Sequence, residues 1–189
     1  MKRRKRGEPQ TNGQFGSLLN NIDFGILHIK VGNANSNAIN SVPSQLINDI
    51  YLTANDATVT RTINITNGNP GGAPFDFDNA SFKINVINKN VKLNDVEKWT
   101  IVNNQVFGHT FHIHDVQFYI LTRNGVAPPA QERAWKDVVL VKNQETVRFI
   151  ARFEDYTDAD HPFMYHCHIA LHEDDGMMGQ FVVVDNSTG

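Results

Sequence analysis

Most of the histidine and cysteine residues, whose side chains can bind transition metals, lie in two short stretches of this sequence. The chain has eight histidines and one cysteine. The first stretch, HTFHIH, contributes His109, His112 and His114, and the second, HCHIALHEDDGMM, begins at His166 and contains Cys167. Imidazole and thiolate are strong ligands of transition metals. The two stretches therefore predict metal chemistry.

The order of residues around the cysteine predicts two separate sites. Successive side chains of an extended strand point to opposite faces of the sheet. Cys167 therefore faces one side, while His166 and His168 face the other. By the same rule His112 and His114 share a face. We expect the thiol to serve one site and its flanking imidazoles to serve another.

The residues on the thiol side match a known set of copper ligands. His172 lies five residues after Cys167 and Met177 lies ten residues after it, so a tight loop would bring both back to the sulfur. His109 adds a second imidazole. Two imidazoles and a thiolate, with a thioether on a long axial bond, are the ligands of a blue copper site. The spacing predicts such a site.

Other chemistry accounts for fewer of these residues. Structural zinc sites more often use pairs of cysteines, and a protease-type Cys–His pair leaves four histidines without a role. Taken singly, a buried cysteine is a small inert hydrophobe, and adjacent Met177 and Met178 would be core residues. Isolated histidines such as His28 and His161 are ordinary surface or core residues. The mutually consistent spacing of the whole set favours copper.

The elements that must position these ligands are strands. Apolar and polar residues alternate with period two from about residue 43 onward, and no segment longer than two turns has a helical period. The alternating segments are 57–66, 82–86, 117–122, 137–142, 145–153 and 179–184. Roughly seven or eight short strands of this kind predict an all-β sandwich or barrel.

The beginning of the chain has a different composition. Residues 1–42 are rich in Asn and Gly, and their one apolar segment, Phe24–Val31, could form only a single strand. One strand cannot bury itself. We expect residues 1–42 to be the tail of a preceding domain plus a linker, and residues 43–189 to form the domain that carries the sites.

Charge and hydropathy exclude several classes of protein. The net charge is −3, and the basic run Lys2–Arg6 lacks the interleaved aromatic residues and basic body of a nucleic-acid-binding protein. We therefore expect no nucleic-acid partner. No apolar run is long enough for a membrane span, and no apolar stretch follows the basic start, so we expect no signal peptide in these residues. The single cysteine allows no internal disulfide.

The segments HTFHIH, WKDVVLV and HCHIALHEDDGMMGQF resemble the C-terminal cupredoxin domain of multicopper oxidases, the family of laccases, bilirubin oxidases and cuprous oxidases. The family's signature is HxxHxH followed by HCHxxxHxxxxM, and residues 43–189 match it at every ligand. The resemblance implies a cupredoxin-like Greek-key fold. It also implies an oxidoreductase that takes single electrons from a small-molecule donor and reduces dioxygen to water.

The resemblance also assigns a role to each ligand by its position in the signature. The implied ligands are His109, Cys167, His172 and Met177 for type 1 copper, His112 for type 2 copper, and His114, His166 and His168 for the type 3 pair. Electrons would pass through Cys167 and its flanking histidines to the trinuclear cluster. Glu173 would deliver protons or orient an imidazole; alternatively, it is a solvated loop acid.

The chain departs from the family pattern in two ways. Thr110 and Asp115 stand where the family usually has Pro and Gly, but neither position is a ligand. The trinuclear cluster also needs four histidines in two His-x-His pairs from the family's N-terminal domain, and no such pair precedes His109. The chain thus carries half of a trinuclear site. We expect N-terminal cupredoxin domains as partners, and no oxidase activity from this chain alone.

Two functions remain open at this point. The chain is either the C-terminal part of a multicopper oxidase or a stand-alone blue copper electron-transfer or copper-binding module. A stand-alone module has no use for His112, His114, His166 and His168, which favours the enzyme. The chain has four methionines and no Met-rich segment, which favours phenol- or bilirubin-type donors over cuprous ions. The resemblance implies a periplasmic or extracellular location.

Overall fold

The computed structural model of the chain describes residues 27–33, 35–37, 39, 41, 44, 51–68 and 74–185. The chain divides into two units, Met1–Tyr51 and Leu52–Gly189. In the first unit, the described residues 27–33 are exposed and form no strand. The described part of the segment Phe24–Val31, which could have formed a strand, is therefore not a strand. The rest of that segment, and most of the predicted tail and linker, lie outside the described residues.

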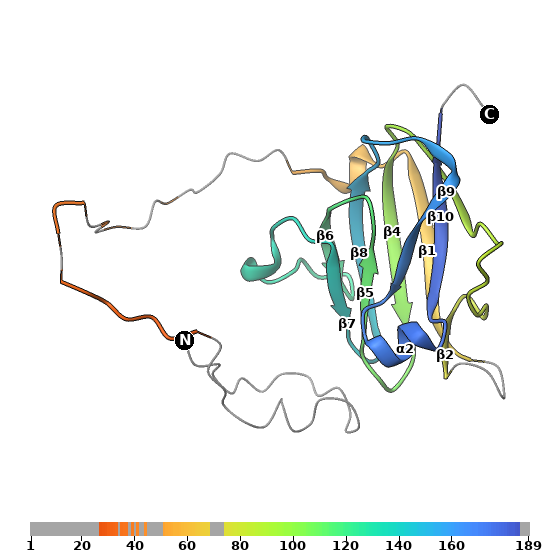
Figure 1. Cartoon of the computed structure of the whole chain (residues 1–189), viewed down its shortest axis with the longest axis horizontal. Helices are drawn as coiled ribbons and strands as arrows, with labels where there is room; N and C mark the ends of the chain where they lie inside the picture. Colours follow the sequence, from red (N-terminus) through yellow and green to blue (C-terminus); the bar gives the residue numbers. More distant parts are fainter. Residues whose placement is uncertain are drawn as a thin grey trace. The chain divides into compact units, whose positions relative to one another are not determined.

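The second unit is a sandwich of two five-stranded sheets (Figure 1). The first sheet has the order β2-β1-β4-β8-β6, and its strands are β1 (Val59–Asn67), β2 (Phe75–Phe77), β4 (Val96–Asn103), β6 (Phe118–Arg123) and β8 (Glu145–Arg152). The second has the order β3-β10-β9-β5-β7, and its strands are β3 (Lys89–Lys92), β5 (His109–Ile113), β7 (Val138–Val141), β9 (Asp158–Cys167) and β10 (Met178–Val184). The prediction of an all-β sandwich is confirmed.

Three short helical turns complete the described structure: η1 (Ala54–Asp56), η2 (Ala130–Glu132) and α2 (Ala170–Asp174). The strands number ten among the described residues, more than the seven or eight predicted. One strand that the pattern missed is β4, which lies inside the first sheet and is buried on both faces. A strand with two buried faces does not alternate, so a period of two cannot reveal it.

The segment 82–86 alternates like a strand in the sequence, but this prediction is wrong. A turn occupies residues 84 and 85, and Ile84 and Val86 are exposed. The side-chain amide of Gln180 donates hydrogen bonds to the carbonyls of Ile84 and Val86 at 2.9 and 2.8 Å. A side chain from β10 thus satisfies backbone groups that would otherwise pair with a neighbouring strand.

Large aromatic side chains fill the space between the two sheets. Trp99, Phe111, Phe149 and Tyr165 are at most 2% exposed and contact one another through their rings. In β8 the alternation predicted from the sequence directs Phe149 into this core. Aromatic side chains of this size contribute much of the burial that stabilises a domain core. The core therefore gives a rigid support to β5 and β9, the strands that carry His109, His112, His166 and Cys167.

The pairing of β5 with β9 brings the two histidine-rich stretches together. These strands are antiparallel neighbours in the second sheet, with Phe111 opposite Cys167 and His112 opposite His166. β10 lies on the other side of β9, where Gly179 is opposite Tyr165. A Cβ at residue 179 would lie 2.4 Å from the tyrosine ring. Only glycine leaves room for that ring in the core.

Candidate metal centres

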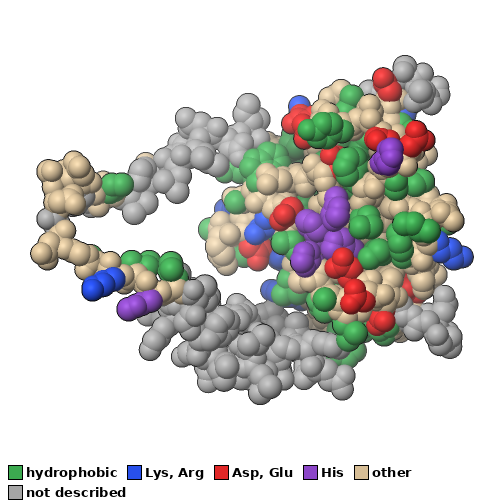
Figure 2. Space-filling model, in the orientation of Figure 1, with side chains coloured by type: hydrophobic (Ala, Val, Ile, Leu, Met, Phe, Trp, Pro, Cys, Tyr) green, Lys and Arg blue, Asp and Glu red, His purple; other side chains and the backbone are tan. Residues whose placement is uncertain are grey.

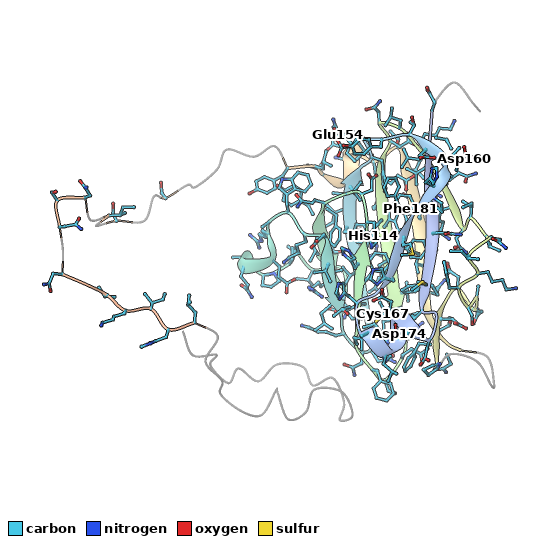
Figure 3. The ribbon with its side chains drawn as sticks, in the orientation of Figure 1. His114, Glu154, Asp160, Cys167, Asp174 and Phe181 are labelled. Atoms are coloured by element: carbon cyan, nitrogen blue, oxygen red, sulfur yellow. The ribbon has the colours of Figure 1, made fainter. Side chains whose placement is uncertain are left out.

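One group of possible ligands surrounds the thiol, and we call His109, Cys167 and His172 the thiol cluster. The Sγ atom of Cys167 lies 3.7 Å from Nδ1 of His109 and 3.5 Å from Nδ1 of His172. All three side chains are buried. Cys167 lies near α2, at the end of β9, whereas His114 lies further along the sheet (Figure 3). The structure thus brings together three of the four ligands predicted for blue copper.

The fourth predicted ligand, Met177, follows a short closed loop. The backbone N–H of Met177 donates to the carbonyl of His172 at 2.9 Å, and its carbonyl accepts from the N–H of Cys167 at 3.0 Å. Gly176 has a φ of 95°, a conformation that glycine adopts without strain, and this turns the chain from α2 into β10. Met177 is fully buried. Its backbone therefore lies directly between two members of the thiol cluster.

Burial determines the protonation of the thiol cluster when no metal is bound. Burial, followed by the nearby charge of His172, lowers the pKa of His109 to about 3. Burial also lowers the pKa of His172 and raises the pKa of the Cys167 thiol. Among the described residues, Nε2 of His109 has no hydrogen-bond partner. Neutral imidazoles are ready to bind a metal, and the thiol would lose its proton on binding.

A second group of histidines lies on the outer face of the second sheet, and we call His112, His114 and His166, with His168 beside them, the imidazole cluster. The ligand atoms of the first three lie within 4.8 Å of one another. The ring of His168 lies 5.3 Å from that of His112 and 5.5 Å from that of His166. Figure 2 shows histidine side chains gathered on one face of the sandwich. The predicted separation into two sites is therefore visible in the geometry.

Hydrogen bonds orient the rings of the imidazole cluster. Nδ1 of His112 lies 2.8 Å from the carbonyl of Asp137, which can only accept, so Nε2 of His112 keeps its lone pair. Nδ1 of His166 lies 3.2 Å from a carboxylate oxygen of Glu173 and 3.3 Å from the carbonyl of Cys167. Partners of this kind fix the tautomer and the orientation of metal-binding histidines. On both rings Nδ1 is thereby the protonated nitrogen, and Nε2 keeps its lone pair.

Burial and repulsion between neighbouring rings disfavour the charged forms of His114 and His166. Burial, followed by the charges of His112 and His166, lowers the pKa of His114. The pKa of His166 is lowered mainly by burial. Nε2 of His114 lies 3.3 Å from Nε2 of His166, too close for both rings to be protonated without strong repulsion. A metal ion between them would replace that repulsion with coordination.

The two departures from the family pattern lie beside these ligands. The carbonyl of Thr110 accepts a hydrogen bond from the N–H of His168 at 2.6 Å, so this residue ties β5 to the end of β9. Asp115 has a φ of 71°, in the left-handed region that favours glycine. Burial, followed by the nearby charge of Asp155, raises the pKa of Asp115 to about 6. At this position an aspartate therefore has an unfavourable backbone conformation, and its ionised carboxylate is disfavoured.

Two contacts of the site were missed from the sequence. The ring of Phe75, in β2 of the opposite sheet, lies 4.6 Å from the ring of His109 and 4.8 Å from that of His172. The Asp137 carbonyl that orients His112 is likewise not readable from the motifs. Both depend on how distant segments pack. No local signal in the sequence could have predicted them.

The model of the multicopper oxidase family matches residues 54–187. The chain belongs to the multicopper oxidase family. It is 38% identical over 108 residues to the multicopper oxidase mco of Staphylococcus haemolyticus, a match that covers 55% of this chain and 23% of that protein. The chain therefore spans about a quarter of this curated multicopper oxidase.

Solved structures of multicopper oxidases have the same fold. A laccase from Pediococcus acidilactici is 32% identical, with a TM-score of 0.67, and the match covers 77% of this chain and 31% of that one. A laccase-like multicopper oxidase, CueO, from Ochrobactrum sp. is 27% identical, with a TM-score of 0.68, over 78% of this chain and 35% of that one. The predicted cupredoxin-like fold is confirmed.

The donor atoms fit the metal that gives the family its name. Multicopper oxidases bind copper, for which imidazole and thiolate are suitable ligands. The thiol cluster offers two imidazole nitrogens and one sulfur around a common point, and the imidazole cluster offers Nε2 of His112 and His166, whose Nδ1 atoms face acceptors. The described helices include none with the length and apolarity to cross a membrane.

Proposed function

We propose that residues 43–189 are the C-terminal copper-binding domain of a laccase-like multicopper oxidase, and that residues 1–42 are the end of the domain before it. The observation that carries this proposal is that one strand end, β9, supplies Cys167 to the thiol cluster and His166 to the imidazole cluster. Copper bound at both clusters would supply one-electron redox chemistry, taking electrons singly from a donor and delivering them to dioxygen.

We assign the ligands by their clusters. The proposed ligands are His109, Cys167, His172 and Met177 for type 1 copper, His112 for type 2 copper, and His114, His166 and His168 for the type 3 pair. The buried thiol cluster suits electron transfer because a dry, rigid site changes little when its charge changes. The imidazole cluster is half-buried to exposed except for His166, so small molecules such as dioxygen can approach it.

The connection between the clusters is both covalent and hydrogen-bonded. Cys167 is bonded directly to His166 and His168, and its carbonyl also accepts a hydrogen bond from Nδ1 of His166 at 3.3 Å. Only a few bonds therefore separate the sulfur of one cluster from the imidazole of the other. This arrangement supports the role of His166, Cys167 and His168 as the path for electrons.

Glu173 supports one face of the imidazole cluster. Its carboxylate lies 3.2 Å from Nδ1 of His166, and its side chain is 32% exposed. The contact favours a role in orienting His166 and holding a proton near the site, rather than that of a solvated loop acid. Because the carboxylate reaches both the imidazole and solvent, it can exchange protons between them.

The imidazole cluster lies on an open face that is suited to another domain. β7 is an edge strand, and Val138 and Leu140 on its outer face are 39% and 36% exposed. Val138 is paired with His112, so the apolar patch adjoins the cluster. Exposed apolar side chains beside polar ligands are typical of an interface. We propose that N-terminal cupredoxin domains of the same enzyme cover this face and supply the missing ligands.

The donor and the location are also proposals. Met177 is fully buried and Met178 is half-buried in β10, so neither offers an exposed thioether for cuprous ions. This supports a phenol- or bilirubin-type donor. We place the protein in the periplasm or outside the cell, where the resemblance to laccases puts it.

Oxygen uptake by the purified, copper-loaded chain tests the proposal. We expect an intense blue band and one-electron reduction by small mediators, but no sustained oxygen uptake with a phenolic donor. The full-length enzyme should show uptake. Sustained uptake by the chain alone would contradict our account of the incomplete cluster.

A variant of the single thiol tests the thiol cluster. Cys167→Ser should abolish the blue band because the chain has no other thiolate. His161→Ala is the matched control, since His161 is exposed and outside both clusters. If the full-length enzyme with intact ligands bound copper without catalysing oxygen reduction, the alternative of an electron-transfer module would be correct.

A further inference from the structure

The two imidazoles of the thiol cluster share one aromatic neighbour. The ring of Phe75 meets His109 edge-on, with centroids 4.6 Å apart and planes at 73°, and packs obliquely on His172 at 4.8 Å and 55°. The two imidazole rings are themselves 5.0 Å apart. Phe75 therefore touches both nitrogen ligands of the cluster at once.

Phe75 reaches this position from the opposite sheet. It is the first residue of β2, an edge strand of the first sheet, whereas His109 belongs to β5 of the second. Phe75 is 8% exposed, whereas His109 and His172 are 0% and 1% exposed. Its ring is thus closer to the surface than the imidazoles that it covers.

The surroundings leave the ring little freedom. Phe107 packs edge-on against Phe75 at 5.7 Å, and the imidazoles hold its other side. Edge-to-face and offset contacts between aromatic rings are favourable beyond the area that they bury. Rotation of either imidazole would break these contacts. The packing therefore fixes the direction of both Nδ1 atoms toward Cys167.

We propose that Phe75 is a positioning residue that orients His109 and His172 and keeps water out of the thiol cluster. This inference rests on the proposed function only in taking copper as the metal that the cluster binds. An apolar shell lowers the local dielectric constant and so disfavours the more highly charged, oxidised form of a bound metal. Phe75 thereby raises the reduction potential of the site and slows the entry of water.

The same strand provides a matched control. Phe77 lies two residues further along β2, faces the same core and is 3% exposed. Its ring contacts Phe111 and Tyr165 at 5.8 and 5.6 Å, with no ring contact to His109 or His172. Leucine at either position removes a buried ring from one strand. Only the change at Phe75 uncovers the imidazoles.

The first experiment uses the metal-free chain, so it does not depend on copper. Diethyl pyrocarbonate modifies accessible imidazoles, and peptide mass spectrometry gives the rate at each histidine. The 86% exposed side chain of His161 serves as the internal reference. Phe75→Leu should speed modification of His109 and His172 severalfold relative to His161, whereas Phe77→Leu should not. Equal rates in Phe75→Leu and wild type would overturn the inference.

A second ring-less variant guards against a failure to fold. If Phe75→Leu does not give the circular dichroism of the wild type, Phe75→Met replaces it, because a flexible thioether chain fills irregular space. Phe75→Tyr keeps the ring and should protect the imidazoles as the wild type does. Fast modification in Phe75→Tyr would also contradict the inference, since the ring would then not be what protects the imidazoles.

The second experiment uses the copper-loaded chain. Loss of the ring should weaken Cu(I) binding relative to Cu(II) binding by about tenfold, as is common when a supporting neighbour of a metal site is removed. A tenfold change is equivalent to a fall of about 59 mV in a one-electron potential. Phe77→Leu should leave the potential unchanged, and an equal fall in both variants would refute the positioning role.

The two experiments separate this inference from the proposed function. A wild-type chain that binds no copper, or binds it without a blue band, contradicts the proposed function, while imidazole modification still decides the role of Phe75. Conversely, unchanged modification and potential in Phe75→Leu overturn the inference even in a chain that binds blue copper.

Discussion

Cys167 and His166 are adjacent residues of one strand, yet their side chains belong to different clusters. Sγ of Cys167 lies with His109 and His172 in the core, whereas Nε2 of His166 lies 3.3 Å from that of His114 on the outer face. The thickness of a single β-sheet therefore separates the two candidate centres. A change at one residue should affect one centre and spare the ligands of the other.

The proposed role of Glu173 predicts an effect on one half of the proposed reaction. In the full-length enzyme, Glu173→Gln should slow oxygen reduction by about 10–100-fold, the usual cost of removing such a support. Reduction of the type 1 copper should change less, because Glu173 contacts His166 of the imidazole cluster. Stopped-flow bleaching of the blue band and oxygen uptake measure the two steps.

Asp174→Asn is the control for this variant, because Asp174 is the next residue and is exposed. It should leave both rates unchanged. Equal slowing of both steps by Glu173→Gln would indicate that Glu173 is an ordinary loop acid.

The buried imidazoles predict acid sensitivity of the metal-free chain. The pKa of His109 is lowered from 6.5 to about 3, so the unfolded chain binds a proton below pH 6.5 that the folded chain does not. Stability should therefore be lost as the pH falls from 6.5 toward 3, by up to about 1.4 kcal/mol per pH unit for this group. His114, His166 and His172 act in the same direction.

Denaturant unfolding between pH 6.5 and 5, with a chelator present, measures this loss. His109→Gln removes one titrating group and should reduce the dependence on pH. The same dependence in the variant and the wild type would show that His109 titrates normally in the folded chain.

The close approach of β10 to Tyr165 predicts a steric requirement at Gly179. Gly179→Ala would place a Cβ 2.4 Å from the Cζ and Oη atoms of a ring that is 2% exposed. The ring cannot move away without disturbing the core, so the cost should be about 1–3 kcal/mol. Thermal unfolding measures it. Gly32→Ala, with no atom within 4 Å of the added Cβ, should cost much less, and similar losses in both would contradict the packing argument.

The backbone at Asp115 predicts a difference between two substitutions that both remove the carboxyl group. With φ at 71°, Asp115→Gly should be more stable than Asp115→Ala by roughly 1–2 kcal/mol, because a Cβ is unfavourable in the left-handed region. Chemical denaturation of both variants gives the difference. Equal stability would mean that the loop relaxes to another conformation once the carboxyl group is gone.

The sequence predicted the parts of the structure that depend on local geometry. The alternation of His166, Cys167 and His168 follows from the pleat of a strand, so their division between two faces was predictable. Residues 82–86 alternate in the same way, but the strand predicted from them is absent. The side chain of Gln180 donates to the carbonyls of Ile84 and Val86, which a strand would use to pair with its neighbour. A pattern of side chains does not reveal which backbone groups find partners.

Contacts between sheets were beyond the reach of sequence patterns. Phe75 is an ordinary apolar residue of a three-residue strand, and nothing near it in the sequence points to His109 or His172. Its position depends on the packing of two sheets. Predictions for such residues require the fold.

The two hydrogen bonds of Met177, to His172 and to Cys167, close the segment between residues 167 and 177 into a ring. A closed loop of fixed length tolerates substitutions but not insertions or deletions. Insertion of one residue within it would shift Met177 out of place and break both bonds. We expect that relatives able to hold copper here differ freely in the residues between their ligands and keep the same number of residues, because the spacing of the motif sets a physical length.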